Sequence, residues 1–232
     1  MTHRVHGHSL VELMIALVIA LVMMLGLTTV LVQMKGVFVA QDQLAQLQDN
    51  ERLALTVLTG SVHSAGYFPD PVSTSAAEAL PADSGLYGAF APGQGLVGQD
   101  HALTVRYRVP PDSALLVNCL GQGHTGTANP VLMSTFSVAP HPQNELLCST
   151  DGGVTTTPLV GNVTGMEVRY GTDSADSGQV DRYLAAAEVN AAGLWPRVRS
   201  VQLTLTFANP LARPGEPATV AWVQTIDLMN GH

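Results

Sequence analysis

An uninterrupted apolar run from Leu13 to Val32 constrains this chain more than any other feature. Its sequence, LMIALVIALVMMLGLTTVLV, contains no charged side chain. As a helix it would be about 30 Å long, which matches the hydrocarbon core of a bilayer. A buried helix of a globular protein usually keeps a polar stripe, and this run has none. We therefore expect residues 8–32 to form a transmembrane helix.

The residues before the run argue against an ordinary secretory signal peptide. The leader MTHRVHG ends in Gly7, and the apolar segment begins shortly after it. A secretory signal would place a small-x-small cleavage site after its apolar stretch, and none follows Val32. We expect residues 1–7 to be removed as a leader peptide and the helix to be retained.

Further along the chain, apolar residues recur at helical spacing, three, four or eight residues apart. They are Leu44, Leu47, Leu55, Leu58 and Val62. No proline interrupts residues 8–68, so residues 33–66 are expected to continue the helix as an amphipathic half. Residues 67–100 are rich in Pro, Gly, Ala and Ser and predict a connecting loop.

The remainder, residues 101–232, has the pattern of strands. In its clearest segment, from Val198 to Phe207, apolar and polar residues alternate, as in a half-buried strand. Other strands are expected to start near Leu103, Ala114, Val131, Gly165 and Thr219. An α+β fold, with an antiparallel sheet packed on the second half of the long helix, is the economical architecture.

A carboxylate, Glu12, lies at the start of the apolar run. Ionisable groups at that depth are costly and indicate function. Cleavage after Gly7 would create a free amine on His8, four residues before Glu12 on the same helical face. In a bundle of such helices, Glu12 could neutralise the amine of a neighbouring subunit and set its register. The alternative is a carboxylate that only snorkels at the membrane edge.

The stretch GHSLVELMIALVIALVMMLG resembles the class III leader and N-terminal helix of type IV prepilins. The segments QLAQLQDNERLALTVLTGSVHSAGYF, NVTGMEVRYGTDSADSGQVDRYLAA and WVQTIDLMN, together with residues 195–207, are similar to the PilW family of minor pilins. His8 stands where that family usually has Phe. The resemblance implies a pilin-like fold, cleavage between Gly7 and His8, N-methylation of His8, and an assembly role for Glu12.

The resemblance also implies a place and partners. The precursor would lie in the bacterial inner membrane, in contact with lipid, with its domain in the periplasm. After assembly it would belong to the pilus tip complex that initiates the pilus and supports adhesion, motility or DNA uptake. Its partners would be the prepilin peptidase, the inner-membrane assembly platform, other minor pilins, the major pilin and a tip adhesin. Alternatives are a minor pseudopilin of a type II secretion system and, less favoured, a membrane-anchored periplasmic enzyme or binding protein.

Two cysteines, Cys119 and Cys148, are the only ones in the chain. The anchor places the domain outside the cytosol, where disulfides persist, so we expect them to form one bridge. The alternative is two separate buried thiols. No CxxC, HxH, HxxxH or GxSxG motif occurs in the soluble part, so neither catalysis nor a metal or cofactor is expected.

The segment Asp173–Asp181 resembles a degenerate calcium loop. Gly178 and Asp181 fit the ligand spacing, but Ala175 and Ser177 stand at ligand positions, so a solvated turn is the better interpretation. Two GxGxxG matches, beginning at residues 93 and 121, do not lie between a strand and a helix and predict loops. With 10 basic and 18 acidic residues, a net charge of -8 disfavours nucleic-acid binding.

Overall fold

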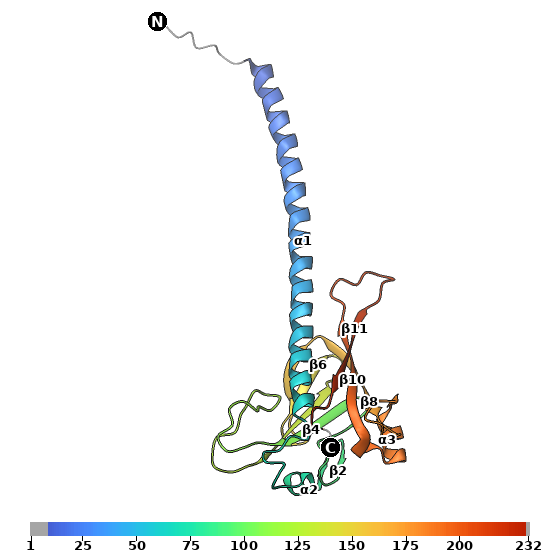
Figure 1. Cartoon of the computed structure of the whole chain (residues 1–232). Helices are drawn as coiled ribbons and strands as arrows, with labels where there is room; N and C mark the ends of the chain where they lie inside the picture. Colours follow the sequence, from blue (N-terminus) through green and yellow to red (C-terminus); the bar gives the residue numbers. More distant parts are fainter. Residues whose placement is uncertain (1–8, 231–232) are drawn as a thin grey trace. The chain divides into compact units, whose positions relative to one another are not determined.

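A computed structural model describes residues 9–230 of the chain, which divides into two compact units, residues 1–46 and 47–232. One helix, α1 (Leu10–Ser64), contributes to both units (Figure 1).

In the first unit, α1 has an exposed apolar surface. Every large apolar side chain between Leu13 and Val32 is more than half exposed. The hydroxyl groups of Thr28 and Thr29 donate to carbonyl oxygens one turn earlier in the helix, at Met24 and Leu25. Their polarity is therefore satisfied within the helix. This segment is long and apolar enough to cross a membrane.

In the second unit, α1 presents a buried stripe to the rest of the domain. The stripe follows the helical period and comprises Leu47, Glu51, Ala54, Leu58, Ser61 and Val62. The helix ends just before Gly66, which has a φ of 77° and lies close to the backbone of Asn230. A Cβ at Gly66 would come within 2.9 Å of the Asn230 carbonyl oxygen, so glycine is required at this position.

The second unit contains two antiparallel sheets and a separate hairpin. The five-stranded sheet runs in the order β3-β4-β5-β6-β7, with bounds Leu96–Gln99, Ala102–Arg108, Val131–Val138, Glu145–Ser149 and Thr157–Gly161. The four-stranded sheet runs in the order β11-β10-β8-β9, with bounds Thr219–Asp227, Val198–Ala208, Val163–Thr172 and Arg182–Leu184. The hairpin pairs β1 (Asp83–Gly85) with β2 (Gly88–Phe90), and the short helices are α2 (Ala76–Ala79), α3 (Ala186–Ala192) and the 3-10 turn η1 (Trp195–Arg197).

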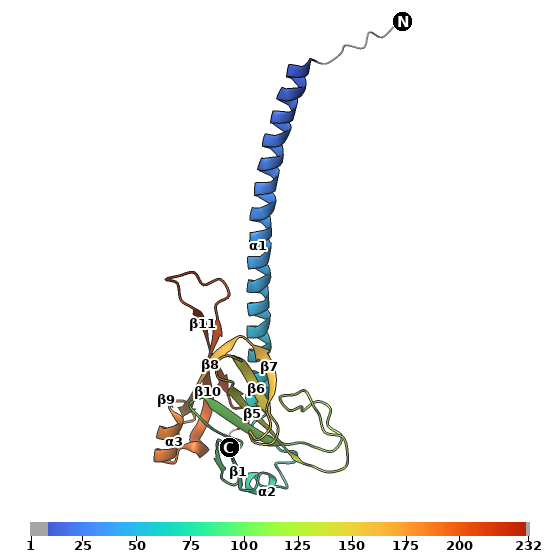
Figure 2. The same ribbon diagram turned by 180° about the vertical axis from the view of Figure 1, so that it is seen from behind.

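The core of this unit joins the end of α1 to both sheets. Leu58 of α1, Phe136 of β5 and Leu203 of β10 are fully buried in one apolar cluster. Figures 1 and 2, which view the molecule from opposite sides, show strands of both sheets beside the last turns of α1. The expected α+β fold, a long apolar helix packed on antiparallel sheets, is confirmed.

Two expectations about local structure were wrong. Residues 67–100 are not simply a connecting loop, because they include α2, β1, β2 and β3. The strand expected near Ala114 does not form, and residues 109–130 are irregular. Pro110 and Pro111 come one residue after the end of β4, and the carbonyl oxygen of Val117 accepts a hydrogen bond from the Tyr107 hydroxyl (2.6 Å) instead of pairing with a neighbouring strand.

Candidate functional site

The candidate assembly surface is the N-terminal part of α1. Glu12 lies in its first turn, and in the sequence no other charge follows until Lys35. The helix dipole favours a carboxylate at this end. Gly7 and His8, the predicted cleavage and methylation positions, lie outside the described residues.

The exposed apolar surface of α1 must be buried by lipid or by another protein. Monomeric soluble proteins rarely expose apolar patches larger than a few hundred Å². The side chains from Leu13 to Val32 form a continuous exposed run around all sides of the helix. Lipid, or the apolar helices of other subunits, can bury this surface, with one carboxylate at its end. The arrangement suits insertion and helix packing, and it contains no catalytic group.

The two cysteines form the expected disulfide, with Cα atoms 6.0 Å apart. Cys148 lies on β6, and Cys119 lies in the irregular segment 109–130. Both are buried, and the backbone N–H of Cys119 donates to the Ser134 hydroxyl (3.0 Å). The bridge therefore anchors a long irregular segment, which has few backbone hydrogen bonds of its own, to the five-stranded sheet.

The turn at Asp173 uses its carboxylate internally. One oxygen accepts from the backbone N–H of Ser177 (2.8 Å) and the other from that of Gly178 (2.7 Å). These hydrogen bonds, the Ser177 one first, hold the pKa of Asp173 below its ordinary value. Among residues 9–230, no group of three His, Cys, Asp or Glu side chains is placed to hold a metal ion. The loop has the geometry of a self-contained turn.

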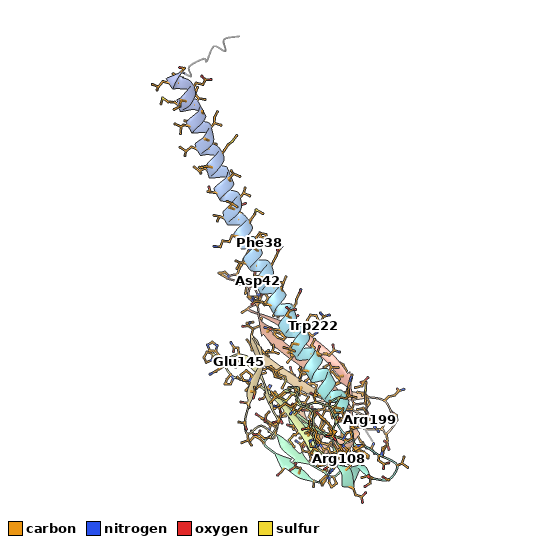
Figure 3. All side chains as sticks on the ribbon, turned by 90° about the vertical axis from the view of Figure 1, so that its left-hand side faces the viewer. Phe38, Asp42, Arg108, Glu145, Arg199 and Trp222 are labelled. Carbon is orange, nitrogen blue, oxygen red and sulfur yellow. A yellow bond between two sulfur atoms is a disulfide. The ribbon has the colours of Figure 1, made fainter. Side chains whose placement is uncertain are left out.

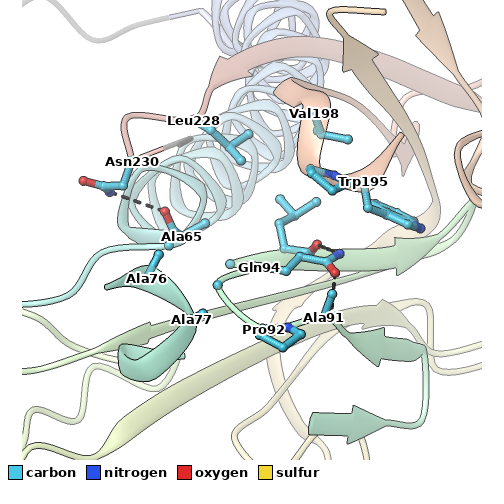
Figure 4. A pocket seen from close by; sticks show the side chains of 15 residues that line it. Ala65, Ala76, Ala77, Ala91, Pro92, Gln94, Trp195, Val198, Leu228 and Asn230 are labelled. Atoms are coloured by element: carbon cyan, nitrogen blue, oxygen red, sulfur yellow. Dashed lines mark hydrogen bonds between the residues drawn. The ribbon is translucent and has the colours of Figure 1, made fainter. Parts of the chain in front are cut away.

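A cavity of about 270 Å³ lies between the end of α1, α2 and the turn η1 (Figure 4). Its lining consists mainly of Ala, Gly and Pro, and the larger lining side chains are Gln94, Leu96, Trp195, Val198, Leu228 and Asn230. No lining residue has a titratable side chain, so the cavity offers no acid, base or nucleophile. Gly95, from the first GxGxxG match, lies against the backbone of Gly66, where a Cβ would come within 2.1 Å of the nitrogen. Glycine at position 95 therefore allows the backbones of Gly95 and Gly66 to pack closely together.

Arg106, on β4, has a structural role that the sequence did not predict. It is 1% exposed, and its guanidinium donates to the carbonyl oxygens of Leu80, Pro81, Ala91 and Gln94 at 2.6–3.2 Å. It also lies 4.3 Å from the ring centroid of Phe90. Burial lowers the pKa of this group. Apolar and polar residues alternate in the sequence of β4, and Arg106 stands at a polar position. The pattern therefore predicted an exposed side chain and gave no indication that Arg106 is buried.

The burial of Glu51 was also not predicted, although here the sequence did contain a signal. It occupies an apolar position in the stripe of α1, four residues after Leu47 and three before Ala54, and only 8% of it is exposed. A carboxylate at an apolar position of an amphipathic helix is the signal that could have identified it. Burial raises its pKa.

Comparison with protein families agrees with the two parts of the structure. Residues 2–28 match the prokaryotic N-terminal methylation motif, which covers Gly7, His8 and Glu12. Residues 121–223 match the family described as Type IV Pilus-assembly protein W, from the segment before β5 into β11. No curated protein and no solved structure gives a significant match.

These matches cover the anchor and most of the β-rich domain, and the observed fold, one long apolar helix and antiparallel sheets, is the fold expected from the resemblance. Over these residues the chain is similar to the PilW family of type IV pilus assembly proteins, a family of minor pilins, and its N-terminal part carries the methylation motif of a class III prepilin.

Proposed function

We propose that this minor pilin is a subunit of the complex at the pilus tip that primes pilus assembly and so supports adhesion, motility or DNA uptake. One observation carries the proposal. An exposed apolar helix begins with a single carboxylate, Glu12, and continues without another charge to Lys35. Outside the bilayer, the apolar surface of such a helix must be buried by other apolar helices. The helix can therefore leave the membrane only as part of a helix bundle.

The domain plan follows from this role. Residues 1–7 are the leader, residues 8–32 the membrane and assembly helix, and residues 33–66 its amphipathic continuation. The prepilin peptidase cleaves between Gly7 and His8 and methylates the new amino terminus. The precursor resides in the inner membrane with its domain in the periplasm, and the mature subunit moves to the pilus tip. Its partners are the assembly platform, the other minor pilins, the major pilin and a tip adhesin.

Glu12 directs assembly by pairing with the amino terminus of a neighbouring subunit. In the low dielectric of a helix bundle, an uncompensated charge costs several kcal/mol. A carboxylate and an amine one helical turn apart in the sequence can pair between subunits that are displaced along the bundle. The pair therefore favours one axial register over others.

The test compares three full-length variants in the native host. Glu12→Ala and the isosteric Glu12→Gln remove the charge, and Asp42→Asn removes an exposed carboxylate elsewhere on α1. Glu12 variants should reach the membrane at wild-type levels and be absent from sheared pili, with fewer pili per cell. Asp42→Asn should behave as wild type.

Intact-mass analysis of the membrane-extracted chains provides the processing control. All three should lack residues 1–7, while Gly7→Arg should retain them. Wild-type incorporation and pilus number in the Glu12→Ala and Glu12→Gln strains would remove the assembly role, and a mature chain that begins beyond residue 30 would contradict the prepilin assignment.

A further inference from the structure

Glu51 is a largely buried residue whose carboxylate, partly desolvated, has no partner among the residues that the structure describes. Only 8% of the residue is exposed on the inner stripe of α1, and within residues 9–230 its carboxylate makes no hydrogen bond or ion pair, although the oxygens keep some contact with water. The only resolved influence on its ionisation is desolvation. A buried carboxylate is costly unless a cation or hydrogen-bond donors compensate for it. Its presence in place of a leucine or alanine therefore requires a reason.

The carboxylate lines a groove of about 510 Å³ between α1 and β11. One side consists of residues from Gln48 to Thr56 of α1, and the other is Trp222 of β11. Figure 3 shows Trp222 beside this part of the helix. Trp222 is 43% exposed, although Ile226, on the same face of the strand, is buried. The groove thus places an open aromatic face near an unpaired carboxylate.

The groove is open along β11 to an incoming segment. β11 is the outermost strand of its sheet, and no further strand among residues 9–230 pairs with it. Its central residues Ala221, Trp222 and Val223 are all exposed. An extended chain could therefore run beside β11 and point a side chain toward Trp222.

The charges of the groove select a cation. Asp49 and Glu51 contribute two negative charges and Arg52 one positive charge, so the lining has a net charge of -1. An aromatic face attracts a cation, and a desolvated contact of this kind is worth up to about 2 kcal/mol. Leu55 offers apolar surface to the aliphatic stem of a long side chain.

A second copy of this chain is the less suitable occupant. Each copy has a net charge of -8, so two copies repel each other.

We propose that the groove between α1 and β11 is a docking site for another protein of the pilus, and that it receives an Arg or Lys side chain between the Trp222 indole and the Glu51 carboxylate. The pilus context rests on the proposed function, whereas the recognition of a cationic side chain does not. The cation compensates Glu51 only in the complex. Glu51 therefore disfavours the free subunit and favours the bound one, which makes the contact selective.

The test uses the full chain in detergent with its two tryptophans labelled with ¹⁵N, so that each indole gives one signal; Trp195→Phe assigns them. The probe is a seven-residue peptide of alternating Thr and Val with a central Arg, compared with the same peptide carrying Gln. The Arg peptide should shift the Trp222 signal and leave Trp195 unchanged, and the Gln peptide should bind at least tenfold more weakly.

Two variants locate the effect. Glu51→Gln should reduce affinity for the Arg peptide at least tenfold, while Asp227→Asn, an exposed carboxylate of β11 outside the groove, should change it less than twofold. Equal binding of both peptides, no shift of Trp222 at millimolar peptide, or unchanged affinity in Glu51→Gln would overturn the proposal. Wild-type self-association that Glu51→Gln abolishes would assign the groove to a second copy and also overturn it. Because the test needs no pilus, its result is independent of the Glu12 experiment.

Discussion

The Asn230 side chain caps the C-terminal end of α1 by a hydrogen bond to the carbonyl oxygen of His63. Its Nδ2 group donates to the carbonyl oxygen of His63 (2.9 Å) and also to that of Ala65 (3.3 Å). The last carbonyl groups of a helix have no partner within the helix. A side chain distant in the sequence thus provides hydrogen bonds that local structure cannot, and it connects the end of the chain to the helix.

Replacement of Asn230 by Ala should lower the free energy of unfolding by about 1–2 kcal/mol, because two buried or half-buried carbonyl groups lose their donor. Asn230→Asp has the same shape but presents an oxygen to those carbonyls, so it should destabilise at least as much. Denaturant unfolding of the full chain in detergent measures both. Thr219→Ala, at the exposed start of β11, should stay within about 0.5 kcal/mol of wild type. An unchanged Asn230→Asp would show that the hydrogen bonds contribute nothing.

Arg106 should tolerate no substitution, not even Lys. Its planar guanidinium donates hydrogen bonds to four carbonyl oxygens. The ammonium group of a lysine has only three N–H donors, all on one nitrogen, so it cannot replace these bonds. Arg106→Lys should therefore cost about 3 kcal/mol or more and increase amide hydrogen exchange in residues 80–94. Arg169→Lys, in an exposed ion pair with Glu167, is the matched control and should cost less than about 0.5 kcal/mol. Equal effects of the two substitutions would contradict the role given to Arg106.

The disulfide should account for a large part of the stability of the β-rich unit. The bridged cysteines are 29 residues apart, and closing such a loop stabilises the folded state by about 3–4 kcal/mol in the chain-entropy model. Cys119→Ser with Cys148→Ser should lower the melting temperature and raise hydrogen exchange in residues 109–130. Peptide mapping without reductant should recover the two cysteines joined in wild-type protein from the periplasm. Two freely alkylated thiols in that protein would contradict the prediction.

Elements with a strong local period could be predicted from the sequence. Leu47 and Leu58 recur at helical spacing and do lie on the buried stripe of α1. In β10, Val201 and Leu203 alternate with polar residues and are fully buried. In these segments the local pattern and the tertiary core agree, so periodicity alone was sufficient.

The remainder depends on contacts between distant residues. Residues 76–94 have no sustained period, and it is Arg106, 12–26 residues away, that binds their carbonyl groups. The apolar run at Ala114 has strand composition but follows two prolines and is held by Cys119. Neither constraint is visible in a window of a few residues. The cost of a carboxylate at the start of the apolar run predicted Glu12 as a site, and the resemblance supported it, whereas the sequence pattern around Glu51 was interpreted only as part of an amphipathic helix.

Glu51 should make the stability of the chain depend on pH in a characteristic direction. Burial raises its pKa in the folded state above the ordinary value, so between those two values the folded state binds more protons than the unfolded state. The cost of burying the charge is fully present above the raised pKa and disappears as the pH falls below the ordinary one. Other titrating groups contribute as well, but they cancel in the difference between wild type and a single variant.

Glu51→Gln removes this cost while keeping the size of the side chain. The variant should be more stable than wild type at pH 7–8, and the difference should shrink as the pH falls toward about 4, near the ordinary pKa of a glutamate, below which Glu51 becomes protonated in both states. Asp49→Asn, an exposed carboxylate of the same groove, is the control and should show a much smaller difference. The measurement is denaturant unfolding of the three full-length proteins from pH 4 to 8. If Glu51→Gln were instead less stable at pH 7, the carboxylate would have a favourable partner in the free subunit, and the presence of the charge could no longer be assigned to docking. A gain in stability together with the loss of Arg-peptide binding would show that the charge is disadvantageous in the free chain and useful only in a complex.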